Sequence, residues 1–112
     1  MSTFTTCHSI DEIEQFIASN QLSFLYISQQ NCSVCHGLEP QIKQLLENYP
    51  NIVARKVDAS EVPEVAGKFS VFTAPVLLLF VYGKEYIREA RFVQTAKLDE
   101  KLARIYENVI DE

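Results

Sequence analysis

The chain has 112 residues, of which 47% are hydrophobic and 22% are charged. These values are typical of one soluble globular domain, which we expect over residues 1–112, and they exclude a disordered or collagen-like chain. The 15 acidic and 10 basic residues give a formal net charge of −5. Binding to nucleic acid or to an anionic membrane surface requires a basic surplus, so this balance argues against both kinds of partner.

The chain begins with a predicted strand and a predicted helix. Residues 3–7 are rich in β-prone side chains. Ser9, with Glu12 three residues later, forms a capping-box pattern and predicts a helix that ends near Asn20. Residues 22–28 are a compact run of apolar and aromatic side chains, which is typical of a buried strand.

A helix, a strand and a short helix follow. Apolar side chains recur at helical spacing over residues 38–49, and Pro50 closes this helix. Residues 52–58 predict a strand. A short helix is expected over residues 62–69, because Pro63 is well suited to the first turn of a helix.

The last part of the chain predicts a hairpin and a final helix. Residues 74–82 are almost continuously apolar and are expected to form a central strand. A turn at Gly83 and Lys84 joins this strand to another over residues 87–93. The final helix has one apolar face, which consists of Leu98, Leu102, Ile105, Tyr106 and Val109.

The predicted order is therefore β-α-β-α-β-α-β-β-α. Apolar strands that alternate with amphipathic helices indicate an α/β fold in which helices cover both faces of one sheet. In such folds, ligands and chemistry gather beyond the carboxyl ends of strands. Cys32 and Cys35 lie just after strand 22–28, at the place where an active site is expected.

The spacing of Cys32 and Cys35 favours reversible redox chemistry. Residues three apart on a helix lie roughly 5–6 Å from one another, which is within the range that a disulfide can bridge. The N-terminus of the helix stabilises a thiolate, and the thiolate is the reactive form of a cysteine. Cys32, nearer the helix tip, is expected to attack the substrate, and Cys35 is expected to resolve the mixed disulfide. The dithiol carries two electrons itself, so neither an organic cofactor nor a metal is expected.

Several segments resemble the thioredoxin family over nearly the whole chain. Cys32-Ser33-Val34-Cys35 is similar to the CxxC motif of that family, and Pro40 is similar to the proline that kinks its active-site helix. Thr73-Ala74-Pro75 resembles the cis-proline segment that faces the two cysteines, and residues 76–80 with Gly83 resemble the following strand and turn.

The resemblance implies a thioredoxin fold, with a central mixed β-sheet flanked by helices on both faces. It also implies that the protein is a thiol–disulfide oxidoreductase acting on protein disulfides. Thr73, Ala74 and Pro75 would line the substrate groove. A thioredoxin reductase is a candidate reductant, and we expect a cytoplasmic monomer.

Four positions beside the cysteines are expected to tune the pair. The thioredoxin family usually has Trp before the first cysteine and Gly-Pro between the two cysteines. This chain has Asn31, Ser33 and Val34 at these positions. His36 follows the second cysteine, where it is expected either to be an exposed neutral residue or to act as a cation that lowers a cysteine pKa.

Two further departures from the family pattern lie outside the motif. Tyr26 stands where thioredoxins have a buried aspartate, and tyrosine, with an ordinary pKa near ~10, is a poor base at neutral pH. We expect its hydroxyl to need a partner, with Lys56 as the candidate. Residues 91–93, Arg-Phe-Val, replace a loop glycine and would place a bulky, charged edge on the groove. Together these changes predict an enzyme that is slower or more selective than an ordinary thioredoxin.

Three other functions are compatible with parts of the pattern. Cys-Ser-Val-Cys-His is also a c-type haem attachment signature, but the only methionine is Met1 and no export signal is visible. A zinc site would draw its ligands from two cysteine–histidine groups, namely Cys7, His8, Cys32, Cys35 and His36. A thioredoxin-like adaptor or redox sensor is the third alternative. Apart from zinc binding, Cys7 is expected to be a buried small hydrophobic residue, with a regulatory disulfide as the alternative.

Overall fold

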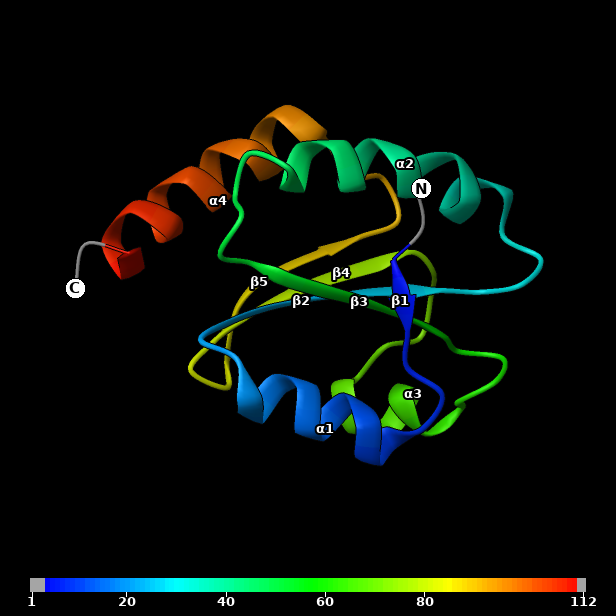
Figure 1. Cartoon of the computed structure of the whole chain (residues 1–112). Coiled ribbons are helices and arrows are strands. Elements are labelled where there is room, and N and C mark those ends of the chain that lie inside the picture. The colour runs from blue at the N-terminus through cyan, green and yellow to red at the C-terminus, as the bar shows by residue number, and fades with distance from the viewer. Residues whose placement is uncertain (1–3, 111–112) are drawn as a thin grey trace.

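A mixed sheet of five strands lies at the centre of the structure, a computed structural model that describes residues 4–110. Figure 1 shows α2 and α4 on one face of the sheet and α1 and α3 on the other. The strand order is β1-β3-β2-β4-β5, with β1, β3 and β2 parallel to one another and β4 and β5 antiparallel to their neighbours. The elements are β1 Thr5–Thr6, α1 Ile10–Ser19, β2 Leu22–Ser28, α2 Ser33–Leu46, β3 Val53–Asp58, α3 Glu64–Phe69, β4 Val76–Val81, β5 Lys84–Ala90 and α4 Thr95–Ile110.

The central strands β2 and β4 are buried along their whole length, as their apolar sequences predict. Side chains therefore pack on both faces of the sheet. On one face, Phe24 and Leu79 pack with the helices α2 and α4. On the other, Leu25 and Leu78 pack with α1 and α3. Burial of this apolar surface on two faces is the main stabilising term for the fold, and it holds the end of β2 in place beneath α2.

Local signals account well for the first helix. The Ser9 hydroxyl accepts a hydrogen bond from the Glu12 N–H over 3.2 Å, which caps α1 as predicted. The Glu12 carboxylate reaches back to the N–H of His8 at 2.5 Å, one residue before the expected position. Of the first predicted strand, Thr3 lies outside the described residues, and the strand itself covers Thr5–Thr6.

The hairpin differs from the prediction. The turn consists of Tyr82 and Gly83, with φ angles of 50° and 82°, instead of Gly83 and Lys84. Strand β5 therefore begins at Lys84 and ends at Ala90, three residues earlier than predicted. Arg91 has a φ of 66° and leaves the strand direction. The sequence pattern of residues 91–93 is β-prone, but the backbone there forms the edge of a groove.

Within residues 4–110, no helix is both long enough and apolar enough to cross a membrane.

Candidate active site

The two cysteines lie where β2 passes into α2. Cys32 is the N-cap residue of α2, and Cys35 lies on its first turn. The two residues are joined in a disulfide, with a distance of 5.2 Å between their Cα atoms. Cys32 is half-buried, whereas Cys35 is 0% exposed. An incoming substrate therefore meets the sulfur of Cys32 first, and Cys35 lies behind it within bonding reach.

The start of α2 favours negative charge on Cys32. The N–H of Cys35 donates a hydrogen bond to Cys32 Sγ over 3.1 Å. There is no acidic residue in the first turn of the helix, so no like charge opposes a thiolate there. The partial positive charge at a helix N-terminus and this N–H both stabilise a thiolate more than a thiol.

The neighbours of the pair lie mostly at the surface. Asn31, Ser33 and His36 are exposed, and Val34 is 58% exposed. His36 Nε2 lies 3.0 Å from the carbonyl oxygen of Gln30, a hydrogen bond that ties the first turn of α2 to the loop before it. This contact gives His36 a role in holding the loop, in addition to the exposed position that was expected.

A groove lies directly beside the disulfide. It has a volume of about 370 Å³ and is lined by Asn31, Cys32, Ser33, Val34, Thr73, Ala74, Pro75, Arg91 and Phe92. The structure thus brings the CxxC segment, the proline segment and the end of β5 together, although they lie far apart in the sequence. The Ala74–Pro75 peptide bond is cis, as the resemblance implies.

In the proline segment, the backbone of Pro75 is hydrogen-bonded, whereas that of Ala74 is not. The carbonyl of Pro75 accepts a hydrogen bond from the N–H of Arg91 over 2.9 Å, which holds the end of β5 against this segment. Within residues 4–110, neither the N–H nor the carbonyl of Ala74 takes part in a hydrogen bond. An extended peptide can pair with such free backbone groups in the manner of an added strand.

Pro40 lies inside α2, as predicted. Proline has no N–H and removes one hydrogen bond from a helix interior, so it is tolerated only where the helix can bend. It directly follows Glu39, whose buried carboxylate pairs with Lys56.

Tyr26 is fully buried, but its partner is not the one expected. Its hydroxyl donates a hydrogen bond of 2.5 Å to the carbonyl oxygen of Cys35, instead of contacting Lys56. Burial, together with the nearby Glu39 carboxylate, raises the pKa of Tyr26 well above its ordinary value. The hydroxyl is therefore a neutral donor that holds the first turn of α2 to the sheet.

Glu39 lies on the active-site helix, and its burial was not predicted from the sequence. Its side chain is only 7% exposed, and its carboxylate pairs with Lys56 Nζ over 3.3 Å. The same carboxylate accepts a hydrogen bond from the N–H of Phe4 over 3.4 Å. Lys56 is thus paired with a buried carboxylate on α2, not with the hydroxyl of Tyr26 as expected. Glu39 lies one turn after Cys35 on the same face of α2, but this spacing alone does not predict that a glutamate is buried.

Replacing Tyr26 with phenylalanine is expected to lower the free energy of unfolding by about 1 kcal/mol, because one buried hydrogen bond is lost. The first turn of α2 should also loosen, so hydrogen exchange at the amides of residues 33–36 should quicken. Urea denaturation and exchange measured by NMR test both effects. Tyr86→Phe is the matched control, since Tyr86 is 57% exposed and should change neither quantity. Unchanged exchange in Tyr26→Phe would show that the hydroxyl does not hold the helix.

The zinc ligand set does not assemble in the structure. Among residues 4–110, no group of three or more His, Cys, Asp or Glu side chains is arranged to hold a metal ion. Cys7 is a buried free thiol, and burial raises its pKa. His8 instead pairs with Glu61, with 2.9 Å between Nδ1 and Oε2. Cys7 therefore packs as the small hydrophobic residue that was expected.

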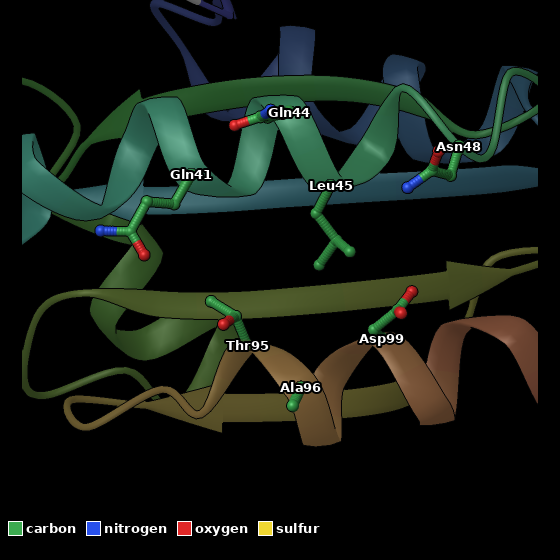
Figure 2. Close-up of a pocket in the computed structure, with 7 residues that line it drawn as sticks. All are labelled: Gln41, Gln44, Leu45, Asn48, Thr95, Ala96 and Asp99. Atoms are coloured by element: carbon green, nitrogen blue, oxygen red, sulfur yellow. The ribbon is translucent and has the colours of Figure 1, made fainter.

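A second hollow lies between α2 and α4, away from the disulfide. Figure 2 shows its lining side chains, with Leu45 of α2 pointing toward α4. It has a volume of about 460 Å³ and is lined by Gln41, Gln44, Leu45, Asn48, Thr95, Ala96 and Asp99. Asp99 already accepts a hydrogen bond of 2.5 Å from the hydroxyl of Tyr49. This hollow contains no thiol, so the redox chemistry belongs to the groove beside Cys32.

Comparison with known proteins agrees with the geometry of this site. The family model described as Thioredoxin matches residues 4–106. The chain is 50% identical over 106 residues to the thioredoxin-like protein YdfQ of Bacillus subtilis, a match that covers 95% of each protein. It is 33% identical over 81 residues to thioredoxin-1 of Saccharomyces cerevisiae, covering 72% of this chain and 79% of the other.

Solved structures show the same fold. Thioredoxin from Trypanosoma brucei brucei superposes with a TM-score of 0.84 at 19% identity, covering 95% of this chain and 93% of the other. Thioredoxin from Fasciola hepatica superposes with a TM-score of 0.80 at 25% identity, covering 89% and 97%. The mixed sheet with helices on both faces is thus a thioredoxin fold. The chain belongs to the thioredoxin family and is a thiol–disulfide oxidoreductase with a redox-active cysteine pair.

Proposed function

We propose that Cys32 is the nucleophile and Cys35 the resolving thiol in disulfide exchange with protein substrates. The Cys32 thiolate attacks one sulfur of a substrate disulfide, forms a mixed disulfide and releases the other substrate sulfur as a thiolate. The Cys35 thiolate then attacks Cys32 Sγ, closes the Cys32–Cys35 disulfide and releases the second substrate thiolate. The substrate gains two electrons and the protein loses two. The observation that carries this assignment is the half-buried Cys32 at the helix tip, with Cys35 buried behind it.

Thr73, Ala74 and Pro75 form the proposed binding edge for the substrate. The free N–H and carbonyl of Ala74 support this assignment, because they are suited to pair with an extended segment beside the reacting disulfide. Asn31, Ser33, Val34 and His36 would then tune the pair through their contacts with the loop and the first turn of α2.

The enzyme is proposed to be slower or more selective than an ordinary thioredoxin. Tyr26 supports this, because its raised pKa leaves it protonated, so it cannot accept a proton from Cys35 at neutral pH. Arg91 and Phe92 support it as well, since they line the groove and narrow the range of substrates that fit.

The proposed setting is the cytoplasm, where a monomer would contribute to redox homeostasis. A thioredoxin reductase is the proposed reductant for the Cys32–Cys35 disulfide. Family members act on protein disulfides and are reduced by thioredoxin reductase, and this is the support for both assignments.

Reduction of insulin tests the slower or more selective activity. The protein and an ordinary thioredoxin are compared at equal concentration, first with dithiothreitol and then with a thioredoxin reductase and its reductant. We expect measurable turnover with dithiothreitol, at a rate at least several-fold below that of the ordinary thioredoxin. Equal rates would contradict the slower or more selective activity, and no turnover of any disulfide would contradict the proposed catalytic roles.

A further inference from the structure

Arg91 is the only charged side chain among the residues that line the groove beside Cys32. The other lining residues are neutral, and the protein as a whole carries a formal net charge of −5. A single cation in the groove of an acidic protein makes the local charge opposite in sign to that of the whole molecule. An approaching substrate therefore meets a cationic site next to the reactive sulfur.

The backbone holds Arg91 in this place. Its N–H is bonded to the carbonyl of Pro75 over 2.9 Å, and its left-handed φ of 66° turns the chain out of β5. Its guanidinium lies over the ring of Phe92, 5.9 Å from the ring centroid. Stacking on an aromatic ring orients the planar guanidinium without neutralising it.

No carboxylate within residues 4–110 pairs with Arg91. Arg88, three residues earlier, offers a contrast. It pairs with Glu85 over 2.8 Å and also donates to the carbonyls of Phe69 and Ser70. The guanidinium of Arg88 is thus paired within the protein, whereas that of Arg91 has no hydrogen-bond partner in the described part of the chain and can bind a ligand.

Exposed apolar side chains line the same groove as this cation. Phe92 is 88% exposed and Val34 is 58% exposed. Large exposed apolar side chains beside a reactive site are typical of surfaces that bind a protein segment. The groove thus combines the sulfur of Cys32, free backbone groups, exposed apolar side chains and one unpaired guanidinium.

We propose that the groove selects protein disulfides whose reacting cysteine lies in an extended segment with an aspartate or glutamate beside it. The carboxylate binds Arg91 while the segment pairs with Ala74 and its apolar side chains contact Phe92. This inference rests on the proposed function, because it requires Cys32 to attack a substrate held in the groove. The chemical step is the same exchange: the substrate disulfide is reduced to two thiols and the Cys32–Cys35 disulfide forms.

Two disulfide-bridged peptides of equal length test the selection. They differ only at the residues flanking the reacting cysteine, which are Asp in one peptide and Lys in the other. With dithiothreitol as reductant and its background rate subtracted, we expect kcat/KM for the Asp peptide to be about fivefold to tenfold higher at low salt. The ratio should shrink as salt is added, since the contact is exposed.

Variants of Arg91 assign the preference to this side chain. Arg91→Glu should reverse the ratio of kcat/KM, Arg91→Gly should bring it close to one, and Arg91→Lys should keep most of it. Lys84→Gln is the matched control, because it removes one positive charge at the opposite end of β5 and should leave the ratio unchanged. Arg91→Gly also suits the left-handed backbone, so the test remains if Arg91→Glu does not fold.

The outcomes distinguish a failure of the proposed substrate preference from a failure of the proposed disulfide exchange. Turnover of both peptides with equal kcat/KM, or a preference that survives in Arg91→Gly, would overturn the role of Arg91 while leaving the exchange reaction in place. No turnover of either peptide would overturn the proposed catalytic roles and this inference with them.

Discussion

Replacing Cys35 with alanine is expected to turn the protein into a trap that holds its substrates on Cys32. Cys32 Sγ still accepts a hydrogen bond from the N–H at position 35, so its thiolate remains stabilised and attacks a substrate disulfide. The mixed disulfide then persists, because no second thiol lies behind Cys32 to resolve it. Turnover should fall to the background of the reductant alone. Captured proteins are measured by non-reducing electrophoresis and identified after release with dithiothreitol.

Two matched variants complete this experiment. Cys32→Ser should abolish both turnover and the capture of substrates as mixed disulfides at position 32, because the half-buried nucleophile is gone. Cys7→Ala on the Cys35→Ala background should trap as well as the parent, since the Cys7 thiol is buried and its pKa is raised. Partners that bind equally to wild type and Cys32→Ser, without a mixed disulfide, would support an adaptor instead of an enzyme. Trapping that depends on Cys7 would contradict the assignment of Cys32.

Replacing Lys56 with methionine is expected to lower the free energy of unfolding by about 2–3 kcal/mol. The change leaves the Glu39 carboxylate buried with the N–H of Phe4 as its remaining partner. Removing one partner of a fully buried ion pair costs more, about 3–5 kcal/mol, but Lys56 is 27% exposed and water offsets part of the loss. Urea denaturation at neutral pH measures the difference.

The double variant Glu39→Gln/Lys56→Met should recover most of that stability, because no buried charge is then left unpaired. Lys101→Met is the matched control. It breaks a pair with Glu89 in which the lysine is 50% exposed, so its cost should stay below about 1 kcal/mol. Equal costs for Lys56→Met and Lys101→Met would contradict the view that Glu39 is a buried charge held by its partner.

Local patterns in the sequence predicted most of the fold. Strand β2 has the predicted bounds Leu22–Ser28, because a compact apolar run of this length fits a buried strand in a covered sheet. Helix α1 begins where Ser9 predicts, because the capping side chain acts within one turn of chain. The placement of Cys32 at the tip of α2 followed from the strand before it and from the helical spacing of the apolar side chains after it.

Contacts between distant segments account for what the sequence did not predict. The hydroxyl of Tyr26 donates to the carbonyl of Cys35, and Lys56 pairs with Glu39 on α2. A glutamate on a helix is usually exposed, so its spacing alone did not single it out. The early end of β5 has a different origin: Arg91 adopts a left-handed φ of 66°, which turns the chain out of the strand and which β-propensity does not describe.

Mass spectrometry of a single turnover tests the central role of the Cys32–Cys35 pair most directly. Fully reduced protein is mixed with an equal amount of a disulfide-bridged substrate, the reaction is stopped with acid, and free thiols are alkylated and mapped. We expect the substrate to gain two thiols, while the protein loses two hydrogens at Cys32 and Cys35 and Cys7 remains a thiol. Reduction of the substrate with Cys32 and Cys35 still alkylatable, or with Cys7 consumed, would contradict the assignment of the reaction to this pair.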